Sequence, residues 1–173
     1  MAIYANEDPI VTQDVDFQLS GTSGRARVLE IAKIWGGQAV FPDPGDATPE
    51  FAKLIFPHID GSDNNNFVVD FLGSPHGLEP EEVLKYRVRL VDEDAAVHFY
   101  VMHPVHCLKS LLYNHQTLPK YRTEMTRERL RKGCRVVRRF LEEVASDDPR
   151  QVYAAVELIA KLADSQHGAS IFG

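Results

Sequence analysis

Near its start the chain reads Thr12-Gln13-Asp14-Val15-Asp16-Phe17. Apart from Gln13, hydrophobic and polar residues alternate from Val11 to Leu19, a period of two that predicts a half-buried strand over residues 10–19. Asp14 and Asp16 then project from the same face of that strand, one pleat apart. Such a pair either faces solvent on an edge strand or holds a divalent cation, and Mg²⁺ is commonly held by one or two carboxylates plus substrate phosphates.

A third acidic residue lies on a later predicted strand. The run Phe67-Val68-Val69-Asp70-Phe71-Leu72 is β-branched and aromatic apart from Asp70, and it predicts a buried strand. A buried charge is usually paired or metal-bound, so Asp70 either bonds to backbone N–H groups or an arginine, or it binds a metal. A strand over 51–59 and the turn at 60–66 make a hairpin with it. Three carboxylates on neighbouring strands can hold two Mg²⁺ ions about 3.5–4 Å apart.

Periodicity and turn residues place the other elements. We expect strands over 38–41, 87–91 and 96–102, and helices over 25–35, 80–86, 105–117, 126–144 and 149–162. The fold class is therefore predicted to be α+β, with a small mixed or antiparallel sheet, flanking helices and a C-terminal helical segment. The predicted domains are an α/β core over 1–102 and a helical region over 103–173.

The Asp-x-Asp strand, the following helix and the apolar strand with a single aspartate together resemble the nucleotidyltransferase superfamily that includes the DNA polymerase β palm. The branch most similar to this chain is that of the minimal nucleotidyltransferases and AbiEii-type toxin proteins of toxin–antitoxin systems. The segment from His103 to Leu112, where a proline opens a helix that carries Lys109, is similar to a segment of the same family. The resemblance covers roughly residues 1–122 and implies a nucleotidyltransferase-like fold.

The resemblance also implies roles for single residues. Asp14 and Asp16 would be Mg²⁺ ligands, and Asp70 would be the third carboxylate, acting on the metal or as base for the incoming hydroxyl. Lys109 would approach the triphosphate. The candidate substrate-binding residues are Thr12, Lys109, Lys120 and Arg122. The implied reaction moves a nucleotidyl group from an NTP to a hydroxyl on RNA, a protein side chain or a small molecule.

The chain departs from the family pattern in two places. The family has a helix and a Gly-Gly or Gly-Ser turn before the Asp-x-Asp strand, whereas residues 1–11 contain no glycine. We expect either that this chain is trimmed or that a phosphate-binding turn has been lost. Family members also often carry a Lys-Asp pair where this chain has Lys120-Tyr121-Arg122. Both departures favour an alternative, a catalytically silent module of the same fold that binds RNA or a protein partner.

Two further patterns suggest other sites. His103 and His106 form an H-x-x-H pair that suits zinc, or they are ordinary polar residues at the mouth of the cleft. Residues 120–139 carry nine basic residues against two acidic ones. This stretch is either a solvated helix face or a surface for RNA or phosphate. It is the element through which the silent module would bind its partner.

The composition of the chain bears on nucleic-acid binding, the oxidation state of the cysteines and the cellular location. The formal charge of −6 argues against a protein that coats nucleic acid over its whole surface. Two cysteines outside any CxxC pattern favour reduced thiols. No run of 18 apolar residues and no secretory signal is found in the sequence. We therefore expect no membrane association and a cytoplasmic location.

Overall fold

The computed structural model describes residues 14–19, 23–46, 48, 50–56, 66–92, 96–147 and 149–164. These residues group into two compact units that divide between Pro75 and His76. We call the described residues before this division the sheet unit and those after it the helical unit. Each unit is considered by itself.

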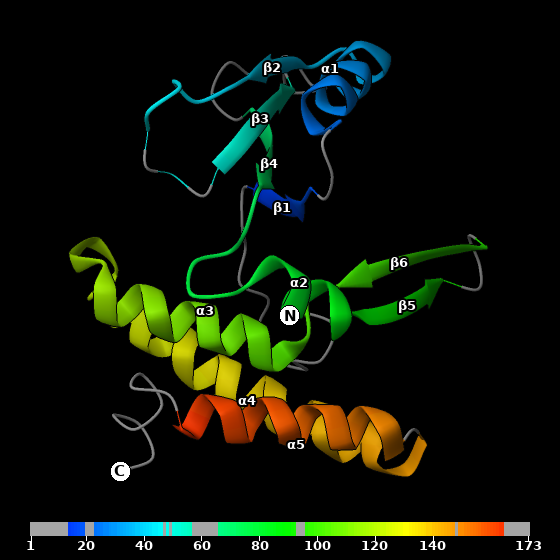
Figure 1. The fold of residues 1–173 in the computed structure, drawn as a ribbon, viewed down its shortest axis with the longest axis vertical. Coiled ribbons are helices and arrows are strands. Elements are labelled where there is room, and N and C mark those ends of the chain that lie inside the picture. The colour runs from blue at the N-terminus through cyan, green and yellow to red at the C-terminus, as the bar shows by residue number, and fades with distance from the viewer. Residues whose placement is uncertain are drawn as a thin grey trace. The chain divides into compact units, whose positions relative to one another are not determined.

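The sheet unit contains one helix and a mixed four-stranded sheet in the order β1-β4-β3-β2 (Figure 1). Its elements are β1 (Asp14–Gln18), α1 (Gly24–Trp35), β2 (Gln38–Val40), β3 (Glu50–Phe56) and β4 (Phe67–Leu72). β1 pairs with β4 in parallel, while β3 pairs antiparallel with both β4 and β2. The predicted antiparallel pairing of β3 with β4 is therefore confirmed, while residues 57–65 between them lie outside the described residues. β1 lies directly beside the strand that carries Asp70.

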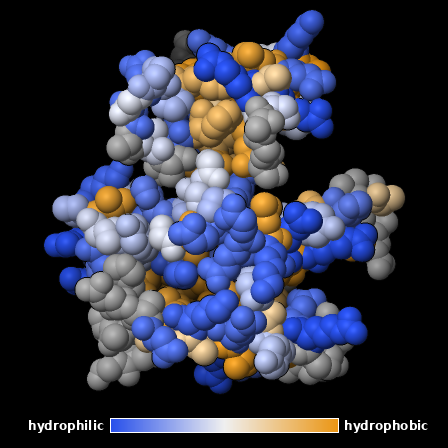
Figure 2. All heavy atoms as spheres, viewed as in Figure 1, coloured by the Kyte–Doolittle hydropathy of each residue, from blue (hydrophilic) through white to orange (hydrophobic). Residues whose placement is uncertain are grey.

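The core of the sheet unit lies between α1 and one face of the sheet. Val28 and Ala32 of α1 pack with alternate residues of the strands, which are Ala52, Leu54, Val69 and Phe71. Because side chains alternate across a strand, the residues between them point to the opposite face. α1 ends as expected, since Gly36 adopts the left-handed conformation with φ 69° that favours glycine at a helix C-terminus. Hydrophobic residues of the sheet unit also reach the visible surface over β3 and β4 (Figure 2).

The helical unit combines a two-stranded antiparallel hairpin with several helices. Its elements are α2 (Pro80–Lys85), β5 (Val88–Asp92), β6 (Val97–Val101), α3 (Pro104–Thr117), the 3₁₀ turn η2 (Pro119–Tyr121), α4 (Glu124–Asp147) and α5 (Pro149–Asp164). One core cluster joins α3, α4 and α5. A second cluster includes Val88 of β5 with Phe140 of α4 and Ala155 of α5. The contacts therefore group residues 88–101 with the helices, whereas the sequence analysis placed them with the α/β core.

The helix termini follow local rules with one correction. Pro104 and Pro149 each stand at the first position of a helix, as expected for a residue that lacks an N–H donor. The sequence analysis expected α4 to begin at residue 126, but the helix begins at Glu124, and the Thr123 hydroxyl accepts a hydrogen bond from the Thr126 backbone N–H at 3.2 Å. The prediction was wrong because either threonine satisfies the sequence pattern for an N-cap.

The α+β class, the mixed sheet and the C-terminal helical region agree with the fold class predicted from the sequence. Among the described helices, none is both long and apolar enough to cross a membrane.

Candidate functional site

The face of the sheet turned away from α1 carries the predicted acidic residues, and we call it the second face. On β1 and β4 it bears Asp16 and Asp70, which are paired in register across the two parallel strands. Neighbouring strands lie about 5 Å apart, so the two residues are neighbours whose side chains project from the same face. The structure therefore brings together two of the three acidic residues that the sequence analysis singled out.

The third acidic residue, Asp14, is opposite Val68 in the same strand pairing. The structure describes only its backbone, which places it two residues from Asp16 along β1 and hence at a second-face position. Thr12 lies outside the described residues.

Asp70 has a positively charged neighbour on the next strand. Lys53 of β3 is in register with Asp70, and its ammonium nitrogen lies 3.1 Å from Asp70 Oδ1 and 2.9 Å from a Glu50 oxygen. The hydrogen bond to Glu50 is the main cause that raises the pKa of Lys53, and Asp70 adds to it against the opposing effect of burial. Asp70 Oδ1 is buried and, within the described residues, lacks a well-aligned hydrogen bond. Asp70 is thus stabilised by a lysine, rather than by the arginine or backbone N–H groups that the sequence analysis considered.

This arrangement suits a hard divalent cation. Asp16 is exposed, while the Asp70 side chain is 15 % exposed, so the pair is accessible from one side. Within the side chains that the structure describes, no group of three or more histidine, cysteine or acidic residues is placed to hold a metal ion. Two carboxylates nevertheless suffice for Mg²⁺ when phosphates and water supply the remaining ligands. Asp16 and Asp70 therefore fit such an ion, with Lys53 as its competitor for Asp70.

Three of the four candidate substrate-binding residues, Lys109, Lys120 and Arg122, belong to the helical unit. Lys109 of α3 lies 3.6 Å from a Glu82 oxygen. The Lys120 ammonium lies 5.1 Å from the centre of the Tyr121 ring, and Arg122 donates a hydrogen bond to the Gln116 carbonyl at 2.8 Å. Each of these residues has a partner inside its own unit, and none of these contacts involves the acidic pair.

Glu82 of α2 is the centre of a charge cluster that the sequence analysis missed. Its carboxylate lies 3.4 Å from Lys161, 3.6 Å from Lys109 and 3.9 Å from His106 Nε2. Burial opposes ionisation of Glu82, but Lys109 and the other neighbouring cations lower its pKa overall. Glu82 occurs in an acidic helix start that has no distinguishing sequence pattern, and its partners come from two other helices.

The two histidines of the H-x-x-H pair are core residues. His103 and His106 are 2 % and 1 % exposed, which corrects the interpretation that they lie at the mouth of a cleft. His103 caps α3 by accepting a hydrogen bond from the Val105 N–H, and its ring meets the Phe140 ring edge-on at 4.9 Å. Burial is the main cause that lowers the pKa of both histidines to about 4. Both are therefore neutral at pH 7.

The arginine-rich stretch is largely compensated within α4. The helix carries seven basic and five acidic residues. Among its described side chains, ion pairs of 2.7–3.6 Å join arginines to glutamates of the same helix. In particular, Arg138 and Arg139 pair with Glu142 and Glu143 one turn later. These internal pairs favour the interpretation of α4 as a solvated helix face.

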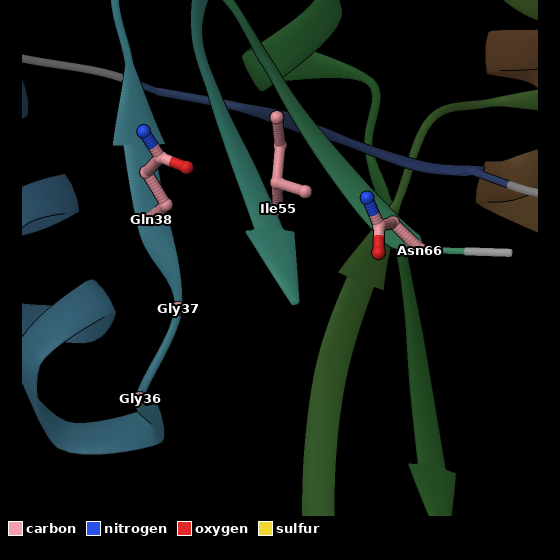
Figure 3. A pocket seen from close by; sticks show the side chains of 5 residues that line it. All are labelled: Gly36, Gly37, Gln38, Ile55 and Asn66. Atoms are coloured by element: carbon pink, nitrogen blue, oxygen red, sulfur yellow. The ribbon is translucent and has the colours of Figure 1, made fainter. Parts of the chain in front are cut away.

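The sheet unit also has a shallow pocket that sequence reasoning did not find. It is lined by Gly36, Gly37, Gln38, Ile55 and Asn66 (Figure 3). The Gly36-Gly37 pair directly follows the helix predicted over 25–35, and that pattern by itself indicates no pocket. The pocket depends on strand pairing, because its side chains come from separate parts of the sheet.

No protein-family model, curated protein or solved structure matches this chain.

Proposed function

We propose that the sheet unit binds the Mg²⁺ complex of a nucleoside triphosphate at Asp16 and Asp70, with Asp14 beside them, and transfers a nucleotidyl group to a hydroxyl acceptor. The observation that carries this proposal is the register of the parallel strands, which pairs Asp16 with Asp70 on the face not covered by α1. Two adjacent carboxylates repel each other, and a divalent cation relieves that repulsion.

Each residue of the second face would have its own role in this reaction. Asp16, which is exposed, would hold the cation, and Asp70 would either share it or accept the proton of the attacking hydroxyl. Lys53 would keep Asp70 in position until substrate arrives. The acceptor oxygen would bond to the α-phosphorus and pyrophosphate would leave. A bound Mg²⁺ would neutralise charge on these phosphates, and such positioning and neutralisation is most of what a protein contributes to these reactions. The acceptor class, an RNA end, a protein side chain or a small molecule, and a cytoplasmic setting are part of the same proposal.

The alternative of a silent module that binds RNA or a protein partner through α4 receives less support. The ion pairs inside α4 already satisfy much of its positive charge. A polyanion would have to compete with carboxylates that are one turn away on the same helix.

A transfer assay tests the proposed function. The purified protein is incubated with Mg²⁺, each α-labelled NTP in turn, and total cellular RNA and protein as acceptors. We expect label transfer by the wild type and its loss in Asp16→Asn and Asp70→Asn. Glu30→Gln is the matched control, because it also removes one carboxylate from the sheet unit, on the exposed surface of α1. Transfer that survives both aspartate substitutions, or no transfer by the folded wild type, would contradict the proposal.

A further inference from the structure

The pocket at the end of the sheet has a volume of about 320 Å³. Figure 3 shows Ile55 of β3 between Gln38 of β2 and Asn66, which directly precedes β4. The Gly36–Gly37 backbone completes the lining where α1 leads into β2. An apolar side chain is thus flanked by two carboxamides at the entrance of a small depression.

This pocket shares a face with the acidic pair. Gln38 is paired with Ile55, and Lys53, two residues before Ile55, is paired with Asp70. Side chains two residues apart lie on the same side of a strand, so these residues all belong to the second face. One strand across and two residues along correspond to a separation of roughly 8 Å between Asp70 and Ile55. A ligand bound through its phosphates at the acidic pair would have the pocket as its neighbour.

The lining has the chemistry that recognises a heterocyclic base. A carboxamide offers both a donor and an acceptor, and in base recognition asparagine and glutamine use both on the edge of one base. Within the described residues, neither the Gln38 nor the Asn66 side-chain amide has a hydrogen-bond partner. Ile55 offers an apolar contact, and an added Cβ at Gly36 would meet nothing within 4 Å, so the backbone there is open to a flat ring.

We propose that this pocket is a nucleobase subsite, in which Gln38 and Asn66 read the edge of a base that packs on Ile55. The inference rests on the proposed function for the source of the base, a nucleotide whose phosphates are held at Asp16 and Asp70. It extends that function by assigning base selectivity to residues of the sheet itself.

Intrinsic fluorescence gives a direct readout. Trp35 is the only tryptophan of the chain, and it is 67 % exposed and adjacent to Gly36. Titrations use the Mg²⁺ complexes of ATP, GTP, CTP and UTP, and also the four free nucleosides and inorganic triphosphate. The variants are Gln38→Met and Asn66→Leu, which keep side-chain size but remove the amides. Gln18→Met is the control, because Gln18 also lies on the second face but at the C-terminal end of β1, away from the pocket.

We expect the wild type to prefer one base by about tenfold or more, as a good amide–base contact does. Gln38→Met and Asn66→Leu should each reduce this preference severalfold and leave the affinity for inorganic triphosphate unchanged. Gln18→Met should retain the preference. Equal affinity of the wild type for all four bases, or a preference unchanged in both amide variants, would overturn the inference.

Failure of the proposed function would give a different result. Asp16→Asn would then leave Mg²⁺-dependent binding of inorganic triphosphate unaltered, or the wild type would show none. In that case the free nucleosides decide the subsite: selective binding that the amide variants lose supports it, and absence of binding overturns it. Short oligoribonucleotides that differ only in the 3′-terminal base test whether the base comes from an RNA end instead of a free nucleotide. If it does, they should compete for the pocket, and their affinity should depend on that terminal base.

Discussion

Lys53→Met should make the sheet unit bind divalent cations more tightly while making the metal-free protein less stable. The Lys53 ammonium lies 3.1 Å from Asp70 and 2.9 Å from Glu50, so it acts as an internal cation at the place where a metal would share Asp70. Methionine retains most of the side-chain length and removes the charge. Asp70 and Asp16 then lose a competitor for the incoming ion.

The magnitude follows from the separation and exposure of the charges. Two unit charges 4 Å apart interact by roughly 4 kcal/mol at an effective dielectric constant near 20. The Lys53 side chain is 36 % exposed, and exposed pairs are worth only about 0.2–1 kcal/mol, so we discount the effect to about 1 kcal/mol. The metal-free variant should therefore lose about 1 kcal/mol of unfolding free energy, and its dissociation constant for Mn²⁺ should fall about fivefold.

Urea denaturation with and without Mn²⁺, together with calorimetric titration, measures both effects. Because a ligand that binds only the folded state adds stability, saturating Mn²⁺ should raise the urea midpoint of Lys53→Met more than that of the wild type. Lys33→Met, at the exposed C-terminal turn of α1, is the control and should leave the Mn²⁺ affinity unchanged. Unchanged or weaker Mn²⁺ binding by Lys53→Met would refute the competition between Lys53 and a metal at Asp70.

Three further predictions concern the fold. Leu54→Ala should lower the unfolding free energy by about 2–5 kcal/mol, because Leu54 is fully buried under α1; a loss below about 1 kcal/mol in urea denaturation would contradict this packing. The pKa of His103 and His106 is about 4 in the folded protein and about 6.5 when unfolded, so the unfolded state binds more protons between these values. The free energy of unfolding should have its full value above pH 6.5 and fall towards pH 4, by up to roughly 3 kcal/mol per histidine. His106→Leu should show a shallower fall with pH, and an equal fall in the wild type and the variant would refute the low pKa of His106. Gly37→Ala should cost about 1–3 kcal/mol, since the added Cβ would lie 2.5 Å from the Phe56 ring, and Phe56→Leu should relieve part of that cost; strict additivity in the double variant would argue against the clash.

Much of the sheet unit could be predicted from local patterns. Alternation around Asp14 and Asp16 gave the strand, and the turn before the run at Phe67–Leu72 gave the β3–β4 hairpin. The expectation that the acidic residues would share neighbouring strands is confirmed for Asp16 and Asp70. These features depend on short-range periodicity and turn residues, which the sequence displays directly.

The partners of the acidic residues could not be predicted in the same way. Whether Lys53 lies opposite Asp70 depends on the register of β3, and a slip of one residue would turn Lys53 to the other face. The pocket residues Gln38, Ile55 and Asn66 could not be predicted for the same reason. They are distant in the chain, and only the pairing of the strands brings them together. Long-range pairing of this kind leaves no local signal.

The helical unit shows a second limit. The H-x-x-H pair suggested exposed polar residues or zinc ligands, yet the hydrophobic contacts of α3 with α4 and α5 bury both rings. Burial of a neutral histidine is decided by tertiary packing, which neither the spacing of three nor the adjacent proline indicates. Glu82 was missed for a related reason, because Lys109 and Lys161 reach it from different helices.

The central claim is that Asp16 and Asp70 form one divalent-cation site on the sheet, and Mn²⁺ binding followed by electron paramagnetic resonance tests it most directly. The wild type should bind Mn²⁺, with Mg²⁺ as a competitor, and inorganic triphosphate should strengthen the binding. Asp16→Asn and Asp70→Asn should each weaken Mn²⁺ binding by about tenfold or more, which is the effect of losing about 1.4 kcal/mol, while Glu30→Gln should match the wild type. Equal Mn²⁺ binding by the wild type, both aspartate variants and the control would contradict the claim.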